Sequence, residues 1–149
     1  MVVSPTFGAD RVRAVVEISA RRRVARPRDE LYEQLADLRG HWRLAGRWVQ
    51  PLELREDGGI VRVLGPAGLH RTIHTMLTDA REPECVAGEA RIGRTRASIQ
   101  WLLEEDGAGT LVTLRADVLE AGLLDRAMLA LGGRRWMQGR FAATLQRLG

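Results

Sequence analysis

The sequence predicts an α+β domain in which a seven-stranded antiparallel sheet packs against one long C-terminal helix. Six short apolar runs in the middle of the chain are separated by turn-forming residues, a spacing typical of an antiparallel meander. Another strand-like run precedes them near the N-terminus. After Gly122 the apolar residues recur at the helical period instead. The 149 residues suffice for one domain with a substantial core.

The first part of the chain is expected to contain one strand. Residues 1–10 contain turn formers and show no periodicity, so we expect a flexible leader there and a folded domain over residues 11–149. From Arg11 to Ala25, valine, isoleucine and arginine alternate roughly with period two, which predicts a long strand. Pro27 ends this strand and suits the first turn of a helix.

Two short helices are expected after the first strand. Residues 28–36 are compatible with a helix in which Leu31 and Leu35 share the apolar side. Residues 38–44 predict a second short helix, which Gly46 closes. Strand signals dominate from there on.

The central part of the chain predicts six strands joined by short turns. Asp57, Gly58 and Gly59 lie between two apolar runs, which is a hairpin signature. Further turn formers separate the later runs and imply antiparallel neighbours. The six strands are expected at residues 48–56, 60–65, 69–80, 85–91, 96–105 and 110–120.

The last predicted element is a helix from Leu123 to Leu148. Gly132 and Gly133 interrupt it, and two glycines cost about 2 kcal/mol relative to alanine in a helix interior, so we expect a kink or break there. The apolar stripe of this helix is formed by Leu124, Met128 and Leu131 before the glycines and by Met137, Phe141, Leu145 and Leu148 after them.

This element order resembles the START-like (SRPBCC) superfamily of helix-grip domains, which includes polyketide cyclases, dehydratases and lipid-transfer proteins. Three short motifs add to the resemblance: Ala25-Arg26-Pro27-Arg28-Asp29-Glu30 at the corner into the first helix, Glu82-Pro83-Glu84 at a turn, and Gly109-Thr110-Leu111-Val112 at a strand opening. The resemblance covers roughly residues 11–148. It implies a curved sheet wrapped around the C-terminal helix, with an apolar ligand cavity between them.

Three functions remain open on this basis. The resemblance implies binding of a hydrophobic or amphipathic small molecule, such as a lipid, a polyketide or an isoprenoid-like compound. It also allows a polyketide cyclase or dehydratase-like enzyme. The third alternative is a protein-interaction module without a ligand, in which Arg21, Arg23 and Arg26 would form the contact. The ligand and the oligomeric state cannot be predicted from the sequence.

Tryptophan and methionine supply most of the candidate ligand contacts. Trp42 and Trp48 flank a turn near the expected entrance, and Trp101 alternates with apolar residues, so it should face the core or the cavity. Methionine adapts to guests of varied shape. The candidate ligand-binding residues are Trp42, Trp48, His74, Trp101, Met128, Leu131, Met137 and Phe141.

Two residues are the candidates for catalysis, His74 and Arg22. A buried imidazole near the middle of a strand can act as a general acid or base near neutral pH, and His74 occupies such a position. Arg22 alternates with apolar residues of the first strand. It either lies at the rim of the sheet with its head in water, or acts as a cation at the cavity mouth.

Composition disfavours several other classes of function. All 23 basic residues are arginine, but 19 acidic residues are interspersed with them, so we expect no specific nucleic-acid partner. His70 and His74 are about 13 Å apart on a strand and cannot share one metal ion unaided. No phosphate loop or other cofactor motif is present, so neither metal nor cofactor is predicted. The single cysteine and the lack of a membrane-spanning apolar run favour a cytoplasmic protein without membrane insertion.

Overall fold

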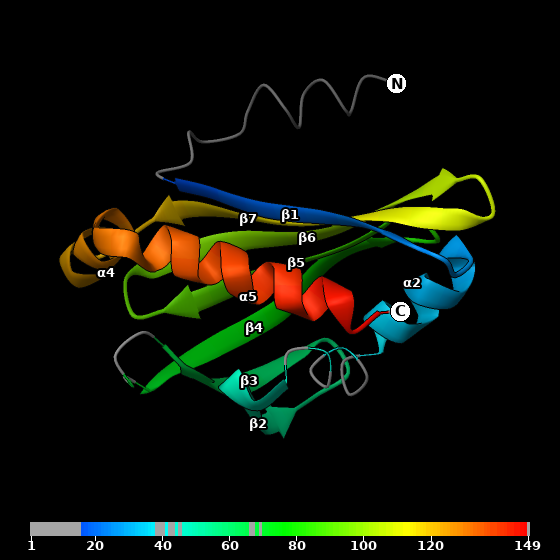
Figure 1. Cartoon of the computed structure of the whole chain (residues 1–149). Coiled ribbons are helices and arrows are strands. Elements are labelled where there is room, and N and C mark those ends of the chain that lie inside the picture. Colours follow the sequence, from blue (N-terminus) through cyan, green and yellow to red (C-terminus); the bar gives the residue numbers. More distant parts are fainter. Residues whose placement is uncertain are drawn as a thin grey trace, which may run out of the picture.

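The computed structural model describes residues 16–37, 41, 44, 46–65, 68 and 70–148. The predicted leader lies outside them. Seven strands form one antiparallel sheet in the spatial order β1-β7-β6-β5-β4-β3-β2 (Figure 1). The predicted seven-stranded helix-grip fold is confirmed. The strands are β1 (Val16–Val24), β2 (Val49–Leu54), β3 (Gly58–Leu64), β4 (His70–Arg81), β5 (Cys85–Ile92), β6 (Thr95–Asp106) and β7 (Gly109–Glu120).

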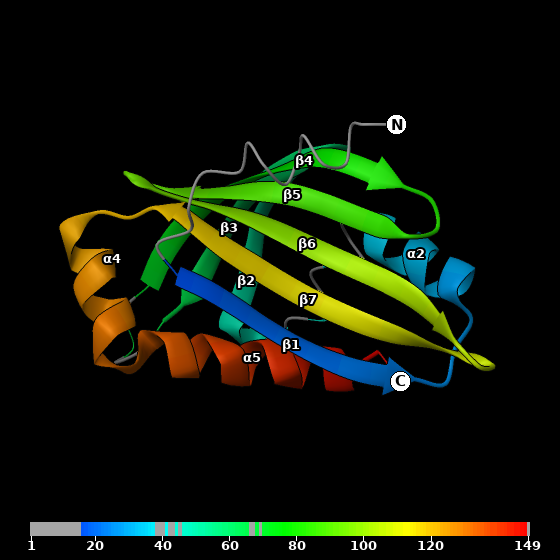
Figure 2. The same ribbon diagram turned by 90° about the horizontal axis from the view of Figure 1, so that it is seen from above.

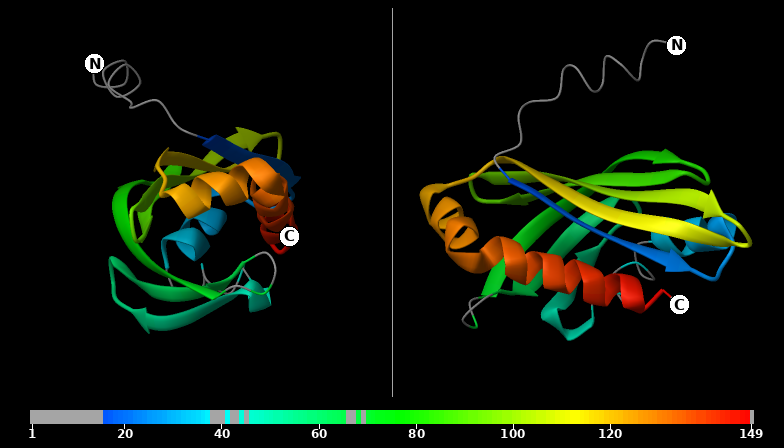
Figure 3. Two further views of the ribbon diagram at one scale, coloured as in Figure 1. Left: turned by 90° about the vertical axis from the view of Figure 1, so that its left-hand side faces the viewer. Right: turned by 45° about the horizontal axis from the view of Figure 1, so that its top comes forward.

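Consecutive strands from β2 to β7 pair with one another, as a meander requires. The first strand joins the other end of this meander, because β1 pairs with β7 along its whole length. The sheet is strongly curved, so β2 and β3 lie across from β1 and β7, and the C-terminal helix closes the open side (Figure 3). This curvature gives the sheet a concave face, on which the apolar residues gather.

The helices lie at the two ends and along the open side of the sheet. The first, α2 (Arg28–Ala36), buries Leu31, Tyr32 and Leu35. A short 3₁₀ turn, η1 (Gly46–Trp48), leads into β2. The second short helix expected at residues 38–44 falls mostly outside the described residues. The C-terminal helix consists of α4 (Leu123–Met128), a π-helical turn, η3 (Leu129–Gly133), and α5 (Arg134–Gln146) (Figure 2).

The predicted break in the C-terminal helix is present. Gly132 has a φ of 115°, which only glycine adopts readily, and Leu131 before it has left helical geometry with φ −96° and ψ 20°. Past the break the helix resumes at Arg134 with a shifted phase. The stripe of the first half therefore does not continue through Leu131, and that side chain is 86% exposed.

The main core lies between the concave face of the sheet and helices α2 and α5. Every second residue of β7 from Val112 to Val118 is buried, as the alternation in the sequence predicts. Trp101 is buried as well. This core includes Ile18, Val24, Leu31, Leu35, Val86, Leu103, Leu114, Phe141, Leu145 and Leu148.

The corner between β1 and α2 is hydrogen-bonded to the backbone that follows α5. The Arg26 guanidinium donates hydrogen bonds to the Leu148 carbonyl at 2.8 Å and to Gln34 at 2.9 Å. The Thr110 hydroxyl donates to the Arg26 carbonyl at 2.7 Å. Two segments of the family-like motifs quoted above thus meet at this corner, where Arg26 has a structural role.

Candidate functional site

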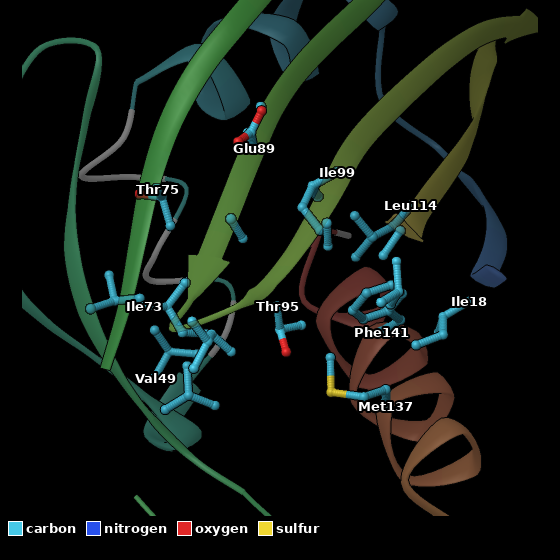
Figure 4. Close-up of a pocket in the computed structure, with 18 of the residues that line it drawn as sticks. Ile18, Val49, Ile73, Thr75, Glu89, Thr95, Ile99, Leu114, Met137 and Phe141 are labelled. Atoms are coloured by element: carbon cyan, nitrogen blue, oxygen red, sulfur yellow. The ribbon is translucent and has the colours of Figure 1, made fainter. Parts of the chain in front are cut away.

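A cavity of about 300 Å³ lies between the concave face of the sheet and the C-terminal helix. Figure 4 shows its walls: Val49 and Ile73 face the cavity from one side, and Met137, Phe141, Ile18 and Leu114 from the other. All seven strands and the C-terminal helix contribute residues to the whole wall, because the curved sheet and the helix together enclose the space. The volume is at the small end of the range typical of small-molecule sites.

The sheet wall is almost entirely apolar. In register, Ala97 lies beside Ala90 on β5 and beside Val118 on β7, and Trp101 lies beside Val86 and Leu114. Paired residues share one face of the sheet, so their side chains form a continuous surface. The wall also contains Val61, Val63, Ile73, Leu77, Gly88, Ile92, Ile99 and Ala116.

The helix wall combines aromatic and flexible side chains. Met128 and Leu129 precede the glycine break, and Met137 and Phe141 follow it. Trp136 meets Trp48 of η1 edge to face, with ring centroids 5.7 Å apart. This pair joins α5 to the start of β2, and so closes the cavity between the helix and the far side of the sheet.

Three polar side chains on the wall form one hydrogen-bonded group, which we call the α4 latch: Arg71, Thr95 and Asp125. Arg71 donates to both carboxylate oxygens of Asp125, at 2.6 and 3.3 Å. The Thr95 hydroxyl donates to Asp125 and accepts a hydrogen bond from the backbone N–H of Gly122 at 3.1 Å. The α4 latch thus joins β4, β6 and the start of α4.

The Asp125 carboxylate is held ionised by this group. Burial alone would raise its pKa, but the hydrogen bonds from Arg71 and Thr95, with the charge of Arg71, bring the pKa below the ordinary value of 3.8. The positive charge of Arg71 is therefore neutralised on the cavity wall. This charge is therefore not free to bind an anionic ligand.

Several other polar groups on the described wall are also hydrogen-bonded, whereas the buried Trp101 Nε1–H has no hydrogen-bond partner. Thr75 donates to the Gly59 carbonyl at 3.3 Å, and Thr144 donates to the Arg140 carbonyl at 2.9 Å. Glu89 accepts a hydrogen bond from Arg91 at 2.7 Å and lies 3.8 Å from Arg96. Each charged residue on this wall, within the described part of the chain, consequently has a partner of opposite charge.

His41 and Trp101 form an aromatic pair in the wall. Their rings meet edge to face with centroids 5.5 Å apart. The His41 Nδ1 is 3.2 Å from the Leu35 carbonyl, which selects the tautomer with the proton on Nδ1. Burial lowers the pKa of His41 below 6.5, although the bond to Leu35 opposes this shift. The imidazole is therefore neutral at physiological pH.

Five of the eight residues proposed to contact ligand lie on the cavity wall: Trp48, Trp101, Met128, Met137 and Phe141. Trp42 lies outside the described residues. Leu131 is directed to solvent, for the reason given above. Contact with a ligand stays a prediction for the five.

The expectation that His74 faces the cavity does not hold. On β4, Ile73 pairs with the buried Val61, whereas His74 pairs with Ile60 and Arg91 on the other face. The His74 side chain is exposed on the convex side of the sheet, and its neighbours Ile73 and Thr75 line the cavity instead. His74 is therefore badly placed for chemistry inside the cavity.

Arg22 does not reach the cavity either. It is exposed on β1, which is an edge strand, and is not part of the cavity wall. This position matches the alternative in which Arg22 lies at the rim of the sheet with its head in water. Neither candidate catalytic residue thus approaches the space where a guest would lie.

Sequence reasoning missed Trp136 and the α4 latch. Helical phase places Trp136 off the apolar stripe of the last helix, but in the structure it lines the cavity. The latch joins three residues from distant parts of the chain, and no spacing in the sequence connects them. The signal that could have identified Asp125 is its isolation, because it is the only acidic residue between Ala121 and Gly149.

Two further observations concern metal sites and membrane-spanning helices. No group of three or more His, Cys, Asp or Glu residues placed to hold a metal ion occurs in the described part of the chain. Within the same residues, no helix is long and apolar enough to cross a membrane.

A family model described as "Polyketide cyclase / dehydrase and lipid transport" matches residues 15–149. Among curated proteins, none matches the sequence significantly.

Solved structures with the same fold come from several bacteria. TTHA0849 from Thermus thermophilus is 15% identical, with a TM-score of 0.65 over 88% of this chain and 92% of that one. DR_A0006 from Deinococcus radiodurans is 19% identical, with a TM-score of 0.64 over 89% and 94%. DynU16, encoded in the dynemicin biosynthetic locus, is 18% identical, with a TM-score of 0.50 over 87% of this chain and 47% of that one. At these identities the likeness concerns the fold alone.

Proposed function

The chain belongs to the polyketide cyclase/dehydrase and lipid transport family, and on this basis we propose that it binds a neutral, mainly apolar small molecule in the cavity between the sheet and the C-terminal helix. The observation that carries the proposal is the wall of this cavity. It is apolar over nearly all of its surface, and each of its few charged side chains has a partner of opposite charge. A space of about 300 Å³ suits a compact ring system or a short chain.

The neutrality of the guest follows from the pairing of Arg71 with Asp125. A carboxylate or phosphate guest would lose its hydration on entry and would need a free cation to replace it. Arg71 lies on the wall, but Asp125 already accepts its hydrogen bonds. An anion would have to displace this carboxylate, which costs more than admitting a neutral guest.

The enzyme alternative has less support. The two candidates, His74 and Arg22, lie outside the cavity wall. His41 is the imidazole that does lie on the described wall, and its low pKa would permit it to act as a base. Its partner Leu35 and its packing on Trp101 give it a structural explanation as well. Binding without turnover therefore accounts for the site with fewer assumptions.

The interaction-module alternative is also weakened. Of its three arginines, Arg23 is paired with Asp106 at 2.8 Å and Arg26 holds the β1–α2 corner together. Arg21 alone remains exposed without an ion pair to a described residue.

A matched pair of dyes tests the proposal. 1-Anilinonaphthalene is neutral, and 1-anilinonaphthalene-8-sulfonate has the same rings with an added anion. We expect the neutral dye to bind with a Kd of about 1–10 μM and the sulfonate to bind at least about tenfold more weakly. Native mass spectrometry of freshly purified protein would then search for a neutral co-purified molecule.

A cavity-filling variant supplies the control. Ala90 lines the cavity and Ala142 is exposed on the outer side of α5. Ala90→Phe should abolish binding of the neutral dye, whereas Ala142→Phe should leave it unchanged. Equal binding by both variants, or tighter binding of the sulfonate in wild type, would refute the proposal.

A further inference from the structure

The net positive charge of this protein is concentrated in its C-terminal segment. Residues 121–149 contain five arginines and a single acidic residue, whereas residues 1–120 contain 18 arginines and 18 acidic residues. The acidic residue is Asp125, and it is turned inward to Arg71. None of the five arginines forms an ion pair with an acidic residue in the described ranges. The outer surface of this segment is thus basic.

The same segment exposes three large apolar side chains. Leu123, Leu124 and Leu131 are 88%, 60% and 86% exposed, and neither α4 nor η3 buries a residue on its outer side. Isolated exposed leucines are ordinary, but three within nine residues form a patch. We call these three leucines, with Arg126 and Arg135 beside them in the chain, the α4 face.

The helix beneath the α4 face covers the cavity. Its inward residues, Asp125, Met128, Leu129 and Gly133, line the cavity wall. Leu123 lies on the opposite side of α4, Leu124 lies one turn before Met128 at the edge of the inward side, and Leu131 is exposed at the break. A surface that contacts the α4 face would therefore lie against the helical segment that covers the cavity.

We propose that the α4 face docks on an anionic lipid surface, with the leucines among the acyl chains and the arginines at the phosphate level. Within residues 121–149, exposed leucines combined with arginines and no exposed acid are the composition of an interfacial helix. The positive charge of the α4 face favours an anionic lipid surface over a second copy of this chain. In a symmetric pair, the second copy would place its own arginines against these arginines. The proposed contact is with the membrane surface only, in keeping with the lack of a membrane-spanning helix among the described residues.

A second cluster of arginines borders this end of the molecule. Arg91, Arg94, Arg96 and Glu120 line a shallow polar depression at the turn between β5 and β6, where Arg91 and Arg96 are each paired with a glutamate. A side chain at Gly122 would contact Arg94, so this turn adjoins the start of α4. Arg94 is exposed and pairs with no acidic residue of the described chain. Figures 1 and 2 show α4 at one end of the sheet, away from α2, where a flat surface can approach it.

Vesicle flotation tests the proposal on the full-length protein. We expect binding to phosphatidylcholine vesicles with about 30% phosphatidylserine, weak binding to pure phosphatidylcholine, and loss of binding as salt is raised. Leu124→Gln/Leu131→Gln should lower the partition coefficient at least about tenfold. Arg126→Gln/Arg135→Gln should lower it for the anionic vesicles only.

Matched substitutions elsewhere serve as controls. Leu52→Gln/Leu64→Gln changes two exposed apolar residues of the sheet that do not line the cavity, and Arg22→Gln/Arg62→Gln changes two exposed arginines outside the segment. Both should bind vesicles as wild type does. The leucine variant should still bind 1-anilinonaphthalene in the absence of vesicles, which separates loss of docking from loss of the cavity.

Three outcomes would overturn the proposal. Wild type could bind both vesicle types equally or not at all, or the leucine variant could bind like wild type. Sedimentation could also reveal a dimer that the leucine substitutions dissolve, which would make the α4 face an interface between two copies of the chain.

Discussion

Arg71 on β4 and Asp125 on α4 are 54 residues apart in the chain, yet their side chains form a two-bond ion pair with a shortest distance of 2.6 Å. Both side chains are mostly buried, so solvent screens the pair only weakly. Because α4 buries no apolar residue, this pair and Thr95 are the principal ties between α4 and the sheet.

Removing one member of this pair should destabilise the protein more than removing both. Asp125→Asn leaves the Arg71 charge without its partner and should lower the free energy of unfolding by about 2–3 kcal/mol. Arg71→Met/Asp125→Leu replaces both by apolar side chains and should cost less than about 1 kcal/mol. Urea denaturation of the two variants measures the difference. Equal losses would show that the pair does not act as a buried unit.

Acid should destabilise the folded state through His41. Its pKa is lower in the folded protein than the ordinary 6.5, so the unfolded chain binds the proton more readily. The stability from the neutral imidazole is therefore complete above pH 6.5 and declines as the pH falls from 6.5 toward the folded pKa. Asp125, whose pKa lies below 3.8, loses its contribution only in stronger acid.

Urea denaturation at pH 7.5 and pH 5 tests this assignment. Wild type should lose stability between the two pH values, and His41→Asn should lose markedly less. An unchanged pH dependence in the variant would assign the titration to other groups.

Two glycines of the C-terminal helix should respond oppositely to alanine. Gly132 has a positive φ, so Gly132→Ala strains the backbone and should cost about 1–2 kcal/mol, although a Cβ there would meet open space. Gly139 is exposed inside α5, also with open space around it, and Gly139→Ala should stabilise the protein by about 0.5–1 kcal/mol. Thermal melts of the two variants give the sign directly. If both stabilise, the break at Gly132 is not required.

Val112 tests the packing of β7 on the core. It is fully buried, so Val112→Asp places a charge without a partner in the core and should cost about 4 kcal/mol. Thr113→Asp is the control, because Thr113 lies on the other face of the strand and pairs in register with Arg21. The melting temperature should fall by at least about 8 °C for the first variant and change little for the second. Similar melting of both would mean that the strand register is wrong.

The sequence predicts the order of the elements well because each one has a local signature. Turn formers mark the ends of the strands, so the strand predicted at residues 110–120 corresponds to Gly109–Glu120 in the structure. The two glycines in a row likewise predict the break in the C-terminal helix. Such signals depend only on neighbours in the chain.

The sequence predicts the candidate site less well, because the face of a sheet on which a side chain lies depends on pairing partners elsewhere in the chain. Residues 70–77 of β4 alternate, but neither face is apolar throughout, and the face of Ile73 is set by its pairing with Val61. That pairing reverses the expectation for His74. Helix phase fails for Leu131, because the backbone at Leu131 and Gly132 leaves helical geometry and the side chain is exposed. Trp136 lies beside the stripe of α5, and its contact with Trp48 from a distant part of the chain accompanies its place on the cavity wall.

Strand β1 is synthesised long before its neighbour β7. Their paired residues lie 86 to 102 positions apart, from Val24 with Thr110 to Val16 with Val118. During translation β1 must therefore wait, with its backbone groups unpaired, until the ribosome has produced β7. Pairing over such separations is slow. A nascent chain halted before Gly109 would present β1 as a bare edge, open to strands of other molecules.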